Sequence, residues 1–190
     1  MPNHPLEVVS FAGSLRNDSI SRMLLRFCLS IAPKEMLINE LTIDEIPLFN
    51  ADLETDGSPK SVGVFKRAIS LADGLLIVTP EYNHGIPAVT KNLIDWASRR
   101  NDEHGNVLSE LPINFIAISG GSGGTGAMVR TQLRQVLVYP GAIPMPKGDF
   151  GVSSNQLTFD KNGNVSDETV KEQIEKTLFD FKNWIDRLTK

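Results

Sequence analysis

The fold is decided by residues 6–21, LEVVSFAGSLRNDSIS, near the start of the chain. The run from Leu6 to Ala12 is almost continuously apolar, and a loop with glycine and serine follows it. Beyond Ser19, apolar residues recur at three- and four-residue spacing. A strand that is buried on both faces gives such a continuous run, and the later spacing is typical of a helix. The stretch therefore predicts a strand, a loop and a helix of a parallel α/β sheet.

Strand-like and helix-like patterns alternate along the rest of the chain. Further apolar runs cover Met36–Leu41, Gly74–Thr79, Ile113–Ser119 and, more weakly, Ala142–Met145. Helical spacing recurs within residues 23–31, 62–72, 89–97, 128–137 and 174–188. Five strands and five helices in this length predict an α/β, flavodoxin-like three-layer sandwich, with a five-stranded parallel sheet of order 2-1-3-4-5. The polar stretch 153–167 predicts a loop. With no repeat or linker, we expect residues 1–190 to form one domain.

Composition limits the function classes. Hydrophobic residues make up 41% of the chain and charged residues 22%, as in ordinary folded proteins. The formal net charge of −4 leaves no basic stripe, so we expect no nucleic-acid partner. Apolar runs such as Leu75–Val78 are too short to cross a bilayer, so we expect no membrane contact. The single cysteine, Cys28, and an N-terminus without signal-peptide features predict a cytoplasmic protein.

The first loop has the composition of a phosphate site. In open parallel sheets, ligands bind beyond the carboxyl ends of the strands, where the strand order reverses. The loop after Ala12 enters a helix near Ser19, and a helix start offers unpaired N–H groups and a partial positive charge. Polar side chains can add donors, from Ser14, Arg16, Ser19 and Ser21. The alternative is a plain connection in which Asp18 or Ser19 caps the helix.

The second loop, PEYNHGIP at residues 80–87, follows the third apolar run. Two prolines stiffen it, and we expect Gly85 to free one backbone position. An aromatic ring, an amide and an imidazole sit together at the ligand edge of the sheet, which suits a flat heteroaromatic ligand. His84 could equally be an ordinary surface histidine.

The third loop, GGSGGTG at residues 120–126, contains a dinucleotide fingerprint. Gly121, Gly123 and Gly126 match G-x-G-x-x-G, and Asp149 lies near the offset of the acidic residue that such folds use. However, too little chain follows to complete a dinucleotide domain. We expect instead that the glycines let backbone N–H groups approach a ring. A merely flexible loop is the alternative.

Taken in order, these motifs resemble the NADPH-dependent FMN reductase family, which includes quinone, chromate and azo-dye reductases. The resemblance spans roughly residues 6–150. It is carried by Gly13–Arg16 with Ser19, by Pro80–Asn83 and by Lys91–Trp96. Serine stands at position 21, where the family often has asparagine.

The resemblance implies that FMN is the cofactor. The phosphate would be held by the first loop, and the flavin ring by the second and third loops. The residues implied are Ser14, Arg16, Ser19, Ile20, Ser21, Pro80, Glu81, Tyr82, Asn83, His84, Gly85, Ser119, Gly120, Gly121 and Gly124. It also implies NADPH or NADH as co-substrate, a small-molecule electron acceptor such as a quinone, free flavin, azo compound or metal oxyanion, and a homodimer or homotetramer.

Because a flavin carries the redox chemistry itself, we expect no catalytic side chain and no metal ligands. An arginine fork suits the 2′-phosphate of NADPH, and Arg99, Arg100 and Arg130 are the candidates. Cys28 falls on an apolar helix face and is expected to be buried and inert. Three alternatives remain. They are a flavodoxin-like electron carrier without NAD(P)H turnover, a dinucleotide enzyme that uses the glycine fingerprint, and a binding module that has lost its cofactor.

Overall fold

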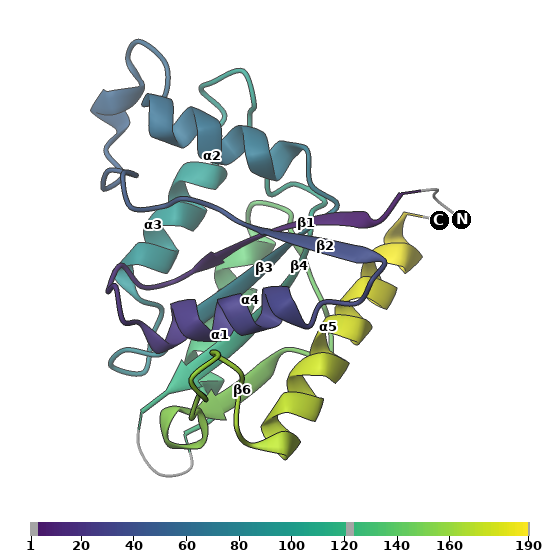
Figure 1. The fold of residues 1–190 in the computed structure, drawn as a ribbon. Helices are drawn as coiled ribbons and strands as arrows, with labels where there is room; N and C mark the ends of the chain where they lie inside the picture. The colour runs from purple at the N-terminus through teal and green to yellow at the C-terminus, as the bar shows by residue number, and fades with distance from the viewer. Residues whose placement is uncertain (1–3, 121–123, 190) are drawn as a thin grey trace.

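The structure, a computed structural model, describes residues 4–120 and 124–189 and contains one parallel sheet. Its central strands lie in the order β2-β1-β3-β4, which confirms the flavodoxin-like α/β fold (Figure 1). Their bounds are β1 (Leu6–Ala12), β2 (Met36–Glu40), β3 (Gly74–Pro80) and β4 (Pro112–Ser119). Every residue of β3 and β4 is buried, as their continuous apolar runs predict.

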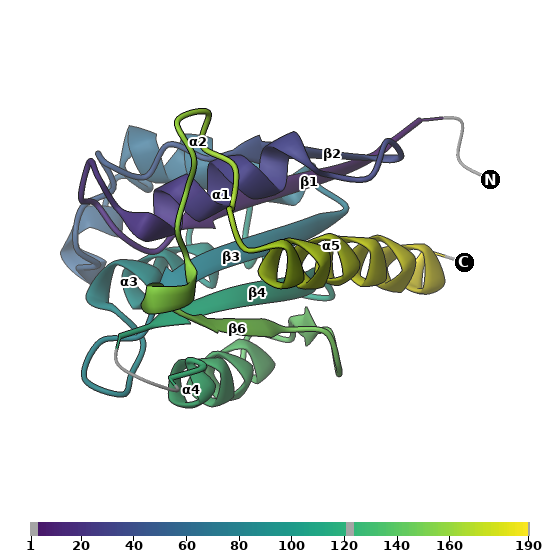
Figure 2. The same cartoon turned by 60° about the horizontal axis from the view of Figure 1, so that its bottom comes forward.

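Helices cover both faces of this sheet (Figure 2). One core cluster joins the sheet to α1 (Ile20–Ser30) and α5 (Glu168–Leu188). The other joins it to α2 (Lys60–Ser70), α3 (Ala88–Ala97) and α4 (Ala127–Val138). Alternate residues of β3 serve the two faces, because Leu76 and Val78 belong to the first cluster, and Leu75 and Ile77 to the second. The three predicted layers are therefore present.

The fifth position of the sheet departs from the expectation of one weak strand. It is filled by two short segments, β5 (Ile143–Pro144) and β6 (Phe150–Ser153), and both pair in parallel with β4. Pro144 and Pro146 have no N–H to donate, so the ladder is interrupted after Met145. Gly148, at a φ of 114°, lets the chain turn back to the sheet.

The predicted loop at 153–167 is also more ordered than expected. It contains one short 3₁₀ turn, η2 (Ser154–Gln156), which follows β6, and an isolated bridge that joins Phe159 to Val165. A second 3₁₀ turn, η1 (Ala51–Glu54), lies between β2 and α2. In the residues that are described, no helix is long and apolar enough to cross a bilayer.

The topology separates two edges of the molecule. The carboxyl ends of β1, β3 and β4 lead into the three loops that carry the motifs. At the other edge, a pocket of about 430 Å³ is lined by residues where β3 and β4 begin and by Leu188 and Thr189 at the end of α5. The first residue of β1 and the last turn of α5 therefore lie away from the motif loops (Figure 1).

Candidate functional site

The first loop is shaped by a close approach at Gly13. A Cβ there would lie 2.1 Å from Thr90 Oγ1 and 2.4 Å from Thr79 Oγ1, so only glycine fits. Ser14 is buried behind it, and its carbonyl accepts a hydrogen bond of 3.1 Å from Arg22 Nε. The path of the backbone here therefore depends on contacts with Thr79 of β3 and Thr90 of α3 as well as on the sequence of the loop.

At the start of α1, Ser19 caps the helix, and this cap is compatible with a phosphate site at the same place. Ser19 is the N-cap, and its Oγ accepts from the amide of Ser21 at 3.2 Å. A hydroxyl that accepts in this way still has its own proton to donate. Within the described chain, no hydrogen bond satisfies the amides of Leu15, Asn17 and Ile20. Arg16 is exposed beside them, so this loop presents several donors and one positive charge.

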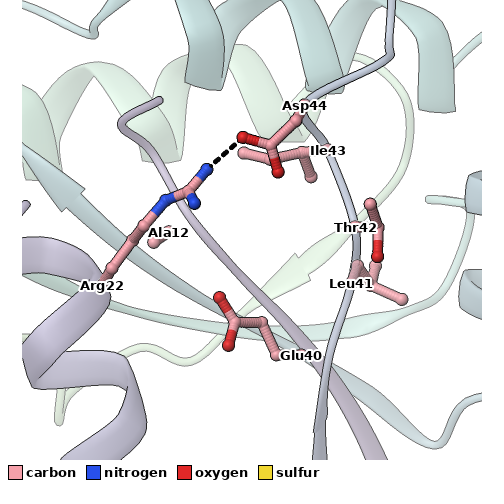
Figure 3. A pocket seen from close by; sticks show the side chains of 7 residues that line it. All are labelled: Ala12, Arg22, Glu40, Leu41, Thr42, Ile43 and Asp44. Atoms are coloured by element: carbon pink, nitrogen blue, oxygen red, sulfur yellow. Dashed lines mark hydrogen bonds and ion pairs between the residues drawn. The ribbon is translucent and has the colours of Figure 1, made fainter. Parts of the chain in front are cut away.

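A pocket of about 170 Å³ lies beside this loop, between the ends of β1 and β2 (Figure 3). Arg22 enters it from α1 and forms an ion pair of 2.5 Å with Asp44. Glu40 lines the same pocket, so two carboxylates face it. Because carboxylates repel an anion, the pocket is a poor phosphate site, and the donors of the loop itself are better placed. Sequence reasoning missed Arg22, which no local spacing distinguishes from other surface arginines.

The second loop forms a two-residue hairpin turn. Tyr82 and Gly85 exchange backbone hydrogen bonds of 3.2 and 2.9 Å, and Asn83 and His84 between them have φ values of 50° and 57°. Positive φ at both central positions defines a type I′ turn. The expectation for Gly85 was wrong in its reason, because Gly85 has no positive φ and instead lies close to Gln132 Oε1.

This turn displays polar and aromatic groups at the ligand edge. Tyr82 is half exposed, and Asn83 and His84 are exposed. Within the described residues, the amides of Asn83 and His84 donate no hydrogen bond. The expected ring-binding loop therefore offers two backbone N–H groups, next to an aromatic side chain.

Pro80 and Glu81 lie at the base of the turn. The amide of Glu81 continues the pairing of β3 with β4 by donating to the carbonyl of Ile118 at 2.7 Å. The side chain of Glu81 points to α4, where Oε2 accepts from the amide of Val129 at 2.9 Å. His84 Nδ1 lies 3.4 Å from the other carboxylate oxygen. Glu81 thus bonds to protein groups with its side chain, although it was predicted to contact the cofactor.

The third loop is tightly built where it is described. Ser119 Oγ accepts from the amide of Gly126 at 3.2 Å. A Cβ on Gly124 would lie 2.3 Å from the same Oγ, and Gly126 has a φ of 61°. Gly120 is exposed, with open space around it. Gly126 is thus a glycine because of its backbone at the start of α4, which explains part of the false fingerprint. Gly121 and Gly123 lie outside the described residues.

Of the three arginines considered for the 2′-phosphate of NADPH, two form ion pairs within the protein and the third lies far from the second loop. Arg99 binds the buried carboxylate of Glu54 through Nε at 2.9 Å and Nη2 at 2.6 Å, and hydrogen bonds from Arg99 hold the pKa of Glu54 below its ordinary value. Arg100 also follows α3, whose ten residues place it about 15 Å along the helix from the second loop. Arg130 pairs with Asp149 at 2.8 Å. Asp149 also binds Arg134 at 2.6 Å, so it ties the segment between β5 and β6 to α4.

Other candidate groups are inert. Burial raises the pKa of the Cys28 thiol to about 12, partly offset by a backbone hydrogen bond. Asp95 pairs with Lys91, and Trp96 is fully buried. No cluster of histidine, cysteine and carboxylate side chains suited to a metal occurs among residues 4–120 and 124–189.

The comparisons with known proteins identify the family. The family described as NADPH-dependent FMN reductase matches residues 6–156. The chain belongs to this family. An NAD(P)H-dependent FMN reductase of Pseudomonas aeruginosa is 36% identical over 183 residues, which cover 96% of this chain and 97% of that protein. A quinone reductase of Escherichia coli K12 is 38% identical over 187 residues, with 96% and 97% covered. The predicted family and type of enzyme are therefore confirmed.

A solved structure supports the same conclusion. The flavoenzyme NAD(P)H:(acceptor) oxidoreductase FerB from Paracoccus denitrificans matches with a TM-score of 0.81 and 28% identity, covering 96% of this chain and 98% of that one. The hydrogen-bond donors at the candidate site of this chain also fit FMN. The free amides and Arg16 at the start of α1 suit a phosphate, and the Tyr82–Gly85 turn and Gly120 offer backbone groups to a ring.

Proposed function

We propose that this chain transfers hydride from NADPH or NADH, through bound FMN, to a small acceptor such as a quinone, free flavin, azo compound or metal oxyanion. One observation carries the proposal. Two loops with unsatisfied backbone donors, at the carboxyl ends of β1 and β3, lie beside the glycine-rich loop that follows β4, at the edge where an α/β sheet of this order binds its ligand.

The first loop is proposed to hold the phosphate of FMN. The amides near the start of α1 and the guanidinium of Arg16 would bind the phosphate oxygens, and hydroxyl groups would add donors from Ser14, Ser19 and Ser21. Ile20 would contribute its amide, because the first residues of a helix have no intrahelical acceptor.

The second and third loops are proposed to hold the ring. When bound, FMN supplies the group that accepts hydride and passes electrons on. The amides of Asn83 and His84 would donate to the edge of the ring. The half-exposed side chain of Tyr82 would limit the access of water to the ring. Pro80, Gly85, Ser119, Gly120, Gly121 and Gly124 are proposed to complete this part of the site through their backbone. Fixed donors of this kind stabilise negative charge that develops on a bound ring.

The wider biological setting is also part of the proposal. We propose one FMN-binding domain over residues 1–190, a cytoplasmic location, assembly as a homodimer or homotetramer, and no nucleic-acid or membrane partner. The relatives named as quinone reductases support a small-molecule acceptor. Because Arg99 and Arg130 are occupied by carboxylates, the proposal includes both NADPH and NADH.

The first experiment tests cofactor and chemistry together. The purified protein is stripped of any flavin, titrated with FMN, and then mixed with NADPH or NADH without oxygen. We expect tight binding of FMN and bleaching of its visible absorbance. Binding without bleaching would favour the electron carrier, and failure to take up FMN would contradict the proposal.

Substitutions at one charge then test the phosphate site. Arg16→Ala should raise the Kd for FMN by about 10- to 100-fold, because a hydrogen bond to a charged group contributes about 1.5–3 kcal/mol. The matched control is Arg26→Ala, which removes the same charge from an exposed position of α1. Equal effects of the two substitutions would show that only net charge matters and would remove Arg16 from the site.

A further inference from the structure

The start of α4 lacks a cap of its own. Its N-cap residue is Gly126, which has no side chain to accept from the first amides of the helix. That acceptor comes from a residue 48 positions earlier, since Glu81 Oε2 accepts from the amide of Val129 at 2.9 Å. The Glu81 side chain is only 10% exposed, so solvent weakens this contact little. Glu81 therefore links the base of the second loop to the N-terminus of α4.

A second link lies one turn further along α4. Gln132 Oε1 accepts from the amide of Ile86 at 3.1 Å, and its Nε2 donates to the carbonyl of His84 at 3.1 Å. The amide group of Gln132 therefore bonds on both sides of Gly85. A Cβ on Gly85 would lie 3.2 Å from Gln132 Oε1, so a glycine leaves room for this contact.

The Tyr82–Gly85 turn needs such support. Asn83 and His84 both have positive φ, which is uncommon for residues with a side chain and is kept only where surrounding contacts fix it. Two backbone hydrogen bonds within the turn close it, but they do not fix its direction relative to the sheet. Glu81 and Gln132 supply that orientation, because their hydrogen bonds join the turn to α4. α4 is itself fixed on the sheet, since Val129 and Leu133 pack in the same core cluster as β4.

We propose that Glu81 and Gln132 are positioning residues that hold the Tyr82–Gly85 turn against α4. Through them, the free amides of Asn83 and His84 are fixed in place before a ring binds. Glu81 then acts through Val129 and the turn, and its carboxylate does not contact the cofactor. The inference rests on the proposed function in one respect, because it takes the bound ring to be that of FMN.

The test compares Gln132→Ala, Glu81→Ala and Glu81→Gln with the wild type. The matched control is Gln135→Ala, at an exposed position of the same helix. The first readout is amide hydrogen exchange in the protein without flavin, at Gly85 and Ile86. We expect Gln132→Ala to speed exchange there by up to about tenfold, because it removes a hydrogen bond that holds the segment, and Gln135→Ala to leave it unchanged. This readout does not depend on FMN, so it separates failure of the inference from failure of the proposed function.

The second readout is the Kd for FMN. Each neutral hydrogen bond contributes about 0.5–1.5 kcal/mol, so loss of the two at Gln132 should raise the Kd by about 5- to 100-fold. Glu81→Gln keeps an oxygen for Val129 and should restore most of what Glu81→Ala loses. If Glu81→Ala does not fold, Glu81→Gln and Gln132→Ala still decide. Unchanged exchange in Gln132→Ala, or a Kd within twofold of wild type in both Gln132→Ala and Glu81→Ala, would overturn the proposal. A Glu81→Gln variant as weak as Glu81→Ala would show that the carboxylate itself contacts the ligand.

Discussion

Gly13 is the residue on which the geometry of the first loop depends most directly. The hydroxyl groups of Thr79 and Thr90 lie 2.8 Å apart, in hydrogen-bond contact, and they occupy the place where a side chain on Gly13 would begin. These two threonines are themselves fully buried between β3 and α3. A methyl group at position 13 can therefore be accepted only if the loop or the pair of threonines moves.

Gly13→Ala should for this reason lower the free energy of unfolding by about 1–3 kcal/mol, the usual effect of overpacking. It should also weaken FMN binding, because the displaced loop carries the phosphate donors. Urea unfolding and FMN titration measure the two effects.

Gly63→Ala is the matched control. Gly63 lies within α2, and a Cβ there meets nothing within 4 Å. This substitution should raise the free energy of unfolding by about 0.5–1 kcal/mol, because alanine favours a helix more than glycine does. A Gly13→Ala protein as stable as wild type would show that the loop is not fixed by this contact.

At the scale of elements, a buried lysine joins α2 to the segment after α3. The side chain of Lys66 is 0% exposed. Its Nζ atom donates to both carboxylate oxygens of Asp102 at 2.7 Å and to the carbonyl of Arg99 at 2.9 Å. Asp102 also accepts from Ser58 and from the amides of His104 and Gly105. The carboxylate is thus a shared acceptor for three parts of the chain.

Removal of the two partners should have unequal effects. Asp102→Ala leaves a buried ammonium group unpaired and should cost about 3–5 kcal/mol of stability. Lys66→Met fills the same space with an apolar chain and leaves Asp102 with its other donors, so it should cost less. Urea unfolding of both variants gives the comparison. A larger loss from Lys66→Met would contradict this account.

The elements also show what could be predicted from the sequence. β3 and β4 were predictable because both faces of the sheet are buried and their residues are continuously apolar. β6 was missed because it is four residues long and contains Gly151, over which the carbonyl of Thr125 lies so closely that a Cβ could not fit. Its signal resembles that of a loop, and only pairing with β4 makes it a strand.

The candidate site divides in the same way. The loops were predictable as motifs that follow apolar runs. The contacts of Glu81 with Val129 and of Gln132 with Ile86 were not, since they join residues 48 and 46 positions apart and have no local pattern. Arg22 was missed for a related reason, because its role depends on a carbonyl and a carboxylate that only the folded chain brings near.

At the scale of the whole molecule, two paired carboxylates make stability depend on pH. Hydrogen bonds from Arg99 hold the pKa of Glu54 below 4.5. Burial raises the pKa of Asp102, but hydrogen bonds from Lys66 and Ser58 outweigh it, so this pKa lies below 3.8. Both groups bind fewer protons in the folded state than in the unfolded state at acidic pH.

The stability that these groups contribute should be fully present above about pH 5 and should be lost as the pH falls below 4.5 and through the lowered pKa values. The free energy of unfolding in urea, measured between pH 7 and pH 3, should decrease over this range. Asp102→Asn should reduce the slope because it removes one of the two titrating groups. An identical slope in that variant would show that other carboxylates account for the acid sensitivity.

The separation of the two edges of the sheet has a practical consequence. β1 begins on the side of the molecule that lies away from the motif loops, and α5 ends on the same side (Figure 1). A tether joined before Leu6 or after Leu188 would therefore leave from the back of the molecule. Fixed to an electrode or fused to a second reductase by either end, the protein would present its redox face outward, open to whatever molecules diffuse past.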